Sequence, residues 1–207
     1  MNQDQDNIRI IKKRAGIIQK VVQFIFTIGV ILLIATLIVV AVVMLFASPE
    51  KFNAVRGSLD WSIQYTLTNG SYFSIGIPFK IIQPYDSSMF SAKYAAIASL
   101  FSISISTSFI LYGTKQVLNI FKSTANDITL FIMDNVRSLE KLAYTIIIYS
   151  VTAKILTNFI FLAFVQKMYI SFDSFYVSGV FTGMLIFFIA DIFKYGVFLQ
   201  KEFDTTL

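Results

Sequence analysis

The chain has 207 residues, of which 56% are hydrophobic and 14% are charged, and its formal net charge is +5. Soluble domains are usually about one quarter charged, so this composition indicates a membrane protein. The absence of cysteine and histidine excludes disulfides, thiolate catalysis, a histidine general base and the common zinc and haem ligands. We expect the basic excess to set topology beside anionic lipid, with no nucleic-acid partner.

The first predicted element is a membrane-spanning helix at about residues 19–46. Its centre is a charge-free run of 26 residues, Val21–Phe46, preceded by a polar and basic segment. As a helix this run would be about 39 Å long, which is enough to cross a bilayer with some tilt. The apolar core of a cleaved signal peptide is much shorter. We therefore expect an uncleaved span that follows a basic, amphipathic cytoplasmic anchor.

A small β-hairpin is predicted within an external loop at residues 47–91. Apolar and polar side chains alternate from Leu59 to Thr68 and resume at Tyr72, on either side of an Asn-Gly pair. Alternation into Asn-Gly is the strongest short-range signal for a hairpin. Because an isolated hairpin is marginal in water, it must pack on something else. Either it is an external binding cap or it is a folded connector, and its candidate residues are Trp61, Tyr65, Asn69, Gly70, Tyr72 and Phe73.

Three further spans complete an all-α membrane fold with four transmembrane helices in a single domain, 1–207. A cytoplasmic loop with a short interfacial helix separates the second span from the third. The spans are predicted at about 92–118, 142–166 and 174–198, and the loop at 119–141. Gly179 and Gly183 of the fourth span form a small-xxx-small face suited to close helix packing.

Polar side chains occur inside the predicted spans. Ser102 and Ser106 share one face of the second span, Lys154 lies near the middle of the third, and Asp191 lies near one rim of the fourth. An ionisable residue at membrane depth requires water, a partner or a function. These residues either serve packing and snorkelling or line a permeation path.

The distribution of lysine and arginine predicts the orientation. Counted outside the charge-free runs, residues 1–20, 115–141 and 194–207 carry five, four and two of them, eleven in all, against five in residues 47–93 and 167–173. Positive charge is retained in the cytoplasm. We therefore expect both termini to be cytoplasmic and the hairpin to be extracellular.

Two segments near the C-terminus resemble a bacterial family of small four-helix membrane proteins that is catalogued as a domain of unknown function, number 2975. The first segment is 135–143, where Asn135, Arg137 and Leu139 lead into the third span. The second is 190–196, with the sequence Ala-Asp-Ile-Phe-Lys-Tyr-Gly, followed by an acidic tail containing threonine. The resemblance implies four helices and no assigned activity. Because members of the family often accompany a small helix-turn-helix regulator, it also implies a regulatory or sensing role.

The available side chains favour a function other than catalysis. The spans contain no paired carboxylates, and the sequence shows no phosphate-binding glycine loop and no metal-ligand cluster. We expect no enzyme, cofactor or metal. The preferred hypothesis is a regulatory, sensing or immunity-type protein of the bacterial cytoplasmic membrane that binds another membrane protein. The alternative is an oligomeric transporter or channel subunit in which Lys154 and Asp191 line a path.

Overall fold

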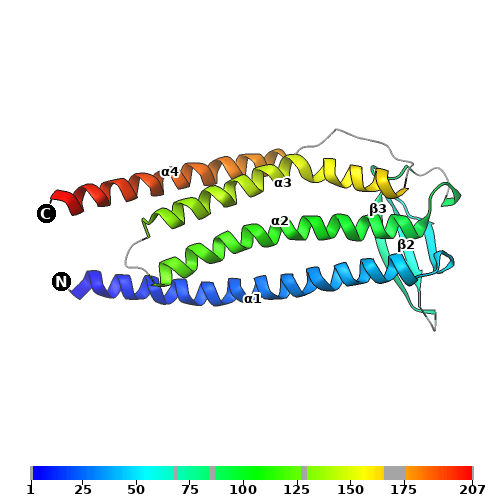
Figure 1. Ribbon diagram of the computed structural model, residues 1–207, viewed down its shortest axis with the longest axis horizontal. Coiled ribbons are helices and arrows are strands. Elements are labelled where there is room, and N and C mark those ends of the chain that lie inside the picture. Colours follow the sequence, from blue (N-terminus) through cyan, green and yellow to red (C-terminus); the bar gives the residue numbers. More distant parts are fainter. Residues whose placement is uncertain (1, 68–69, 84–86, 127–129, 166–175, 207) are drawn as a thin grey trace. The chain divides into compact units, whose positions relative to one another are not determined.

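The computed structural model describes residues 2–67, 70–83, 87–126, 130–165 and 176–206. Four long helices and three strands make up the described chain (Figure 1). The helices are α1 (Asn2–Phe46), α2 (Ala92–Asn126), α3 (Met133–Val165) and α4 (Val177–Thr206). The strands are β1 (Phe52–Arg56), β2 (Asp60–Thr66) and β3 (Tyr72–Pro78).

Each of the four helices is long and apolar enough to cross a membrane. The candidate spans are Arg9–Phe46, Ala92–Asn126, Met133–Val165 and Val177–Phe203. Many of their large apolar side chains are exposed, Phe24 and Phe188 among them. Lipid chains are as apolar as leucine, so a bilayer accommodates such surfaces. The predicted number of spans is therefore confirmed by length and composition.

The helices around the predicted cytoplasmic loop are longer than expected. Residues 119–126 continue α2, and α3 already begins at Met133, so most of the predicted loop is helical. From Met133 onward, the residues of the predicted interfacial helix form the first turns of α3, so this helix is continuous with the third span. The segment after Lys115 contains neither glycine nor proline, and Gln116 and Thr124 are buried two turns apart. Charged side chains therefore interrupt the apolar run without ending the helix.

Contacts between residues divide the chain into two compact units. The single domain expected from the sequence stays a prediction. The first unit comprises Met1–Ile31, Ser108–Val151 and Tyr176–Leu207, and the second comprises Leu32–Thr107 and Thr152–Phe175. Helices α1, α2 and α3 contribute to both units, and α4 belongs to the first.

A three-stranded antiparallel sheet of order β1-β2-β3 belongs to the second unit. The predicted hairpin is confirmed as β2 and β3, which pair from Asp60↔Pro78 to Thr66↔Tyr72. Strand β1 was not predicted, and it pairs with β2 from Phe52↔Tyr65 to Arg56↔Trp61. Only one of its five residues, Phe52, is buried. The sequence of β1 lacks the alternation of apolar and polar side chains that predicted β2.

The inner face of the sheet forms a hydrophobic core with helical segments of the same unit. Trp61, Ile63 and Ile77 are exposed by no more than 2%. They belong to one cluster with small residues of α2 and with two large side chains near the end of α3: Ala95, Ala96, Ala98, Phe161 and Val165. The alanines allow the sheet to approach the α2 backbone closely. The hairpin thus gains the packing partner that an isolated pair of strands lacks.

Candidate functional site

The tip of the β2–β3 hairpin exposes apolar side chains. Leu67, Tyr72 and Phe73 are 38%, 59% and 68% exposed. The Leu67 N–H donates to the Ser71 carbonyl oxygen at 2.8 Å, which closes the turn. Gly70 lies within the turn at φ 76°, a conformation that side chains other than glycine rarely adopt. We call the group Leu67, Tyr72 and Phe73 the hairpin tip.

Two of the predicted hairpin residues, Trp61 and Tyr65, lie in or beside the core of the sheet. The Trp61 ring packs edge-on against Phe90, with centroids 5.2 Å apart, and against Phe79 at 6.0 Å. Tyr65 is half-buried, and its ring lies 4.8 Å from that of Phe52. The predicted hairpin residues therefore separate into a structural pair and an exposed pair. Asn69 lies outside the described residues.

The outer face of the sheet is mainly polar. It carries the residues of β2 and β3 that alternate with the buried ones: Asp60, Ser62, Gln64, Thr66, Tyr72, Ser74, Gly76 and Pro78. β3 is an edge strand of the described sheet, so one side of its backbone has no partner strand there. An edge strand beside exposed aromatic rings is a typical surface for binding an extended segment of another protein.

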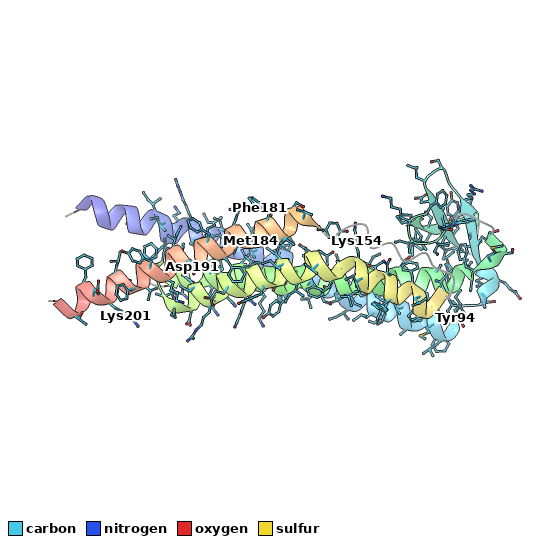
Figure 2. The ribbon with its side chains drawn as sticks, turned by 90° about the horizontal axis from the view of Figure 1, so that it is seen from above. Tyr94, Lys154, Phe181, Met184, Asp191 and Lys201 are labelled. Carbon is cyan, nitrogen blue, oxygen red and sulfur yellow. The ribbon has the colours of Figure 1, made fainter. Side chains whose placement is uncertain are left out.

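The predicted polar residues of the spans have different environments. Ser102 Oγ is buried without a hydrogen-bond partner in the described structure, and Ser106 is half-buried. Lys154 on α3 is half-buried and has an interaction partner. Asp191 is exposed on α4, and Figure 2 labels both Asp191 and Lys154. Asp191 belongs to the first unit, whereas the other three belong to the second. The hypothesis that they line a common path stays a prediction.

Gly179 and Gly183 lie against α3 within the first unit. A Cβ at Gly183 would collide with the Ile147 side chain and would lie 3.1 Å from the Ala143 carbonyl oxygen. A Cβ at Gly179 would collide with Ser150. Tight approach of two helices through small residues is a common way to associate helices in lipid. The two glycines therefore act in helix packing.

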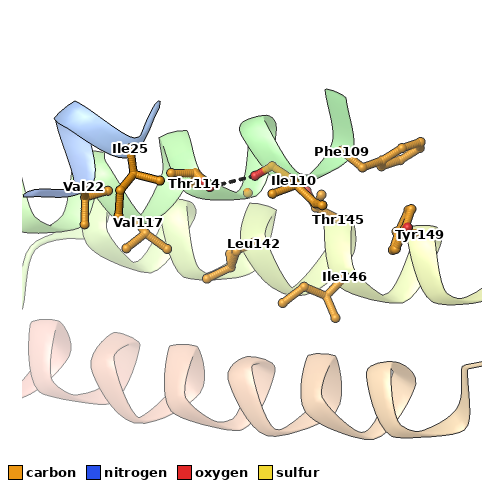
Figure 3. A pocket seen from close by; sticks show the side chains of 11 residues that line it. Val22, Ile25, Phe109, Ile110, Thr114, Val117, Leu142, Thr145, Ile146 and Tyr149 are labelled. Carbon is orange, nitrogen blue, oxygen red and sulfur yellow. Dashed lines mark hydrogen bonds between the residues drawn. The ribbon is translucent and has the colours of Figure 1, made fainter. Parts of the chain in front are cut away.

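A lateral groove of about 420 Å³ opens between α1, α2 and α3 of the first unit (Figure 3). Its wall is almost entirely apolar and includes Ile25, Phe109 and Ile146. The Thr114 hydroxyl in this wall donates to the Ile110 carbonyl oxygen at 2.8 Å, so its hydrogen-bonding capacity is used within α2. Such a surface suits hydrocarbon better than water or ions.

Acidic side chains do not gather into a metal site in the part of the chain that the structure describes. The described residues contain no group of three His, Cys, Asp or Glu side chains able to hold a metal ion. An ion pair joins Arg137 and Asp134 at 3.6 Å on the exposed surface of α3.

Comparison with known families assigns the chain to one of them. A family model described as "Protein of unknown function (DUF2975)" matches residues 81–207. The chain belongs to this family. The family match confirms the resemblance seen at Asn135–Ala143 and at Ala190–Gly196, and it includes α2, α3 and α4 in full. Strands β1–β3 precede the matched DUF2975 region. No curated protein and no solved structure matches the chain.

Sequence reasoning missed a polar groove in the matched DUF2975 region. It lies between the last turns of α2 and the first turns of α3, and Gln116, Asn135 and Ser138 are among its buried residues. The available signal was the presence of three uncharged polar residues on faces of helices that otherwise bury apolar side chains. Their positions on separate helices, however, gave no indication that they line one groove.

Proposed function

We propose that this chain is a non-enzymatic membrane protein that regulates, senses or protects by binding another protein. The hairpin tip is its contact surface, and the observation that supports this assignment is the exposure of Tyr72 and Phe73 beside a well-packed core. A connector between two spans needs a stable fold but no exposed aromatic pair. Tyrosine and other aromatic residues dominate binding energy at protein interfaces, and polar groups usually surround them.

The partner is a protein that presents an extended, partly apolar segment. The unpaired edge of β3 offers backbone N–H and carbonyl groups to such a segment, and the two rings offer apolar contact. The polar outer face beside them supplies a rim that hydrogen-bonds water when the site is empty. A lipid-facing surface of the same area would gain nothing from those polar groups.

Both termini are cytoplasmic in this proposal, and the sheet is extracytoplasmic. The support is the excess of lysine and arginine in the terminal segments and in the α2–α3 region. Since the chain contains no cysteine, a single introduced cysteine can be labelled uniquely. A membrane-impermeant maleimide should label Ser74→Cys in intact cells and Lys201→Cys only after the membrane is opened. The reverse pattern would show that the orientation is inverted.

The recognition role is tested by changing the hairpin tip. Full-length protein and its Tyr72→Ser/Phe73→Ser variant are purified from their own membrane in mild detergent, and the masses of co-purifying proteins are determined. Truncating a central aromatic anchor typically costs about 2 kcal/mol or more of binding free energy. We therefore expect the affinity for the partner to fall at least about 30-fold. Leu59→Ser is the matched control, because Leu59 is 81% exposed but lies at the opposite end of β2.

Two outcomes would contradict the proposal. If the double variant retains its partner as well as the Leu59→Ser control does, the hairpin tip is not the contact surface. If the unaltered protein is recovered only as a homo-oligomer, the proposal that it binds a different protein is wrong. Emission from Trp61, the chain's single tryptophan, should stay unchanged in both variants and thereby verify that the sheet remains folded.

A further inference from the structure

A second groove in the first unit differs from the apolar one in its chemistry. It has a volume of about 440 Å³ and runs between the C-terminal part of α2 and the N-terminal part of α3. Three lysine or arginine side chains line it, Lys122, Arg137 and Lys141, against one carboxylate, Asp134. Asp134 is already engaged with Arg137 at 3.6 Å. The lining therefore carries an excess of positive charge.

Two polar side chains that line this groove make no hydrogen bond within the described part of the chain. Gln116 is 4% exposed and Ser138 is 8% exposed, yet neither side chain forms a hydrogen bond within the described part of the chain. By contrast, the Asn135 amide nitrogen donates to the Leu130 carbonyl oxygen at 2.9 Å. Because the Gln116 and Ser138 side chains line the groove, they are free to hydrogen-bond water or a ligand bound there. Both groups are able to donate to an anion.

The polar groove continues into an apolar furrow along the same seam. Lys141 lines both, and the furrow of about 400 Å³ is formed by Tyr112 of α2 and by Tyr144 and Ile148 of α3, among others. From Lys141 to Ile148 the seam extends about 10 Å along α3. A single ligand that fills both parts needs an anionic head and a hydrocarbon chain.

We propose that this seam binds an acidic phospholipid, with its phosphate among Lys122, Lys141, Gln116 and Ser138 and an acyl chain along Tyr112 and Tyr144. A free phosphate would use the cationic part of the groove alone and would leave the furrow unexplained. Basic pockets between membrane helices are well suited to acidic headgroups. The predicted cytoplasmic location of the α2–α3 region would place the groove at the leaflet that is rich in such lipids.

Delipidated full-length protein in neutral detergent is titrated with short-chain phosphatidylglycerol, phosphatidylcholine or inorganic phosphate, and bound lipid is counted by native mass spectrometry. We expect phosphatidylglycerol to bind preferentially. Gln116→Leu removes an uncharged hydrogen-bond donor to the charged phosphate, and it should weaken the binding of phosphatidylglycerol about tenfold. Ser138→Ala should weaken the binding of phosphatidylglycerol about threefold. This smaller change tests the same inference if Gln116→Leu fails to fold.

Charge variants separate the groove from general surface attraction. Lys122→Gln/Lys141→Gln should weaken the binding of phosphatidylglycerol about fivefold for each lysine removed. The matched control, Lys194→Gln/Lys201→Gln, removes the same charge from α4 outside the groove and should change binding less than about twofold. Equal affinity for phosphatidylglycerol and phosphatidylcholine would overturn the proposed site. Equal effects of the two double lysine variants would overturn it as well. Displacement of phosphatidylglycerol by inorganic phosphate would overturn its assignment to lipid.

Discussion

Ile77→Ala tests whether the core beneath the sheet stabilises it as the contacts indicate. Ile77 is 1% exposed, and it pairs directly with Trp61 across β2 and β3. The substitution removes three carbon atoms from a position enclosed by the sheet and by the alanines of α2. It changes no polar group and no backbone hydrogen bond. The expected effect is therefore loss of apolar burial and creation of a cavity beside the Trp61 ring.

The magnitude follows from the number of atoms removed and from the packing around them. At about 0.8 kcal/mol for each buried methylene or methyl group, the loss of three groups costs about 2.4 kcal/mol. A cavity that fails to collapse raises the cost toward about 5 kcal/mol. Because the neighbouring side chains are a rigid indole ring and small alanines, collapse should be limited. We expect the free energy of unfolding of the sheet to fall by about 3–4 kcal/mol.

Trp61 supplies the assay, because the chain has a single tryptophan. Its emission in detergent-solubilised protein should shift to the red as denaturant unfolds the sheet, and Ile77→Ala should bring the midpoint to a lower denaturant concentration. Val55→Ala is the control, since Val55 is 46% exposed on β1 and should change stability by less than about 0.5 kcal/mol. Equal midpoints for Ile77→Ala and the unaltered protein would refute the reasoning.

Three further substitutions test other contacts. Gly183→Leu should cost about 1–3 kcal/mol through collision with Ile147 and should lower the melting temperature in detergent, whereas Gly16→Leu, with open space around it, should not. Gly70→Val should destabilise the hairpin by about 1–3 kcal/mol because of the positive φ, and Gly70→Asn by less; the shift of Trp61 emission with denaturant measures both. Asn135→Ala should lower the free energy of unfolding by about 1–3 kcal/mol, because the Asn135 side chain is 1% exposed and its hydrogen bond to the Leu130 carbonyl oxygen is lost; thermal loss of helical circular dichroism measures the change.

The elements that sequence reasoning located share a strong local signal. Charge-free runs such as Val21–Phe46 cannot be stable in water, so they predict spans wherever they occur. Alternation ending in Asn-Gly predicted β2 and β3 because the turn conformation requires a residue such as Gly70. In both cases the physical requirement lies within about twenty consecutive residues, and the neighbouring fold adds little to it.

The features that sequence reasoning missed depend on partners distant in sequence. β1 is a strand because it hydrogen-bonds to β2, while its own residues bury only Phe52. The end of α2 and the start of α3 were assigned to a loop because their charged residues reduce hydropathy, although hydropathy does not determine where a helix ends. Gln116 and Ser138 are 22 positions apart in the sequence. Only the alignment of the two helices brings them into one groove.

The proposed protein contact and the proposed lipid site can be separated experimentally, because they belong to different units of the chain. The hairpin tip also precedes the matched DUF2975 region, whereas the groove lies wholly within it. Tyr72→Ser/Phe73→Ser should abolish partner recovery and leave phosphatidylglycerol binding within about twofold of its original value. Gln116→Leu should have the opposite effect, with weaker lipid binding and unchanged partner recovery. Both assays use the full chain in the same detergent.

Combining the two sets of substitutions measures their coupling. If the sites are independent, the free-energy changes of the single variants add within about 0.5 kcal/mol in the combined variant. If acidic lipid instead regulates the protein contact, lipid must change partner affinity, and the partner must change lipid affinity by the same factor. Independence therefore predicts the same partner recovery in phosphatidylglycerol and in phosphatidylcholine. A difference that disappears in Gln116→Leu would refute independence and would identify the groove as the regulatory site of the hairpin contact.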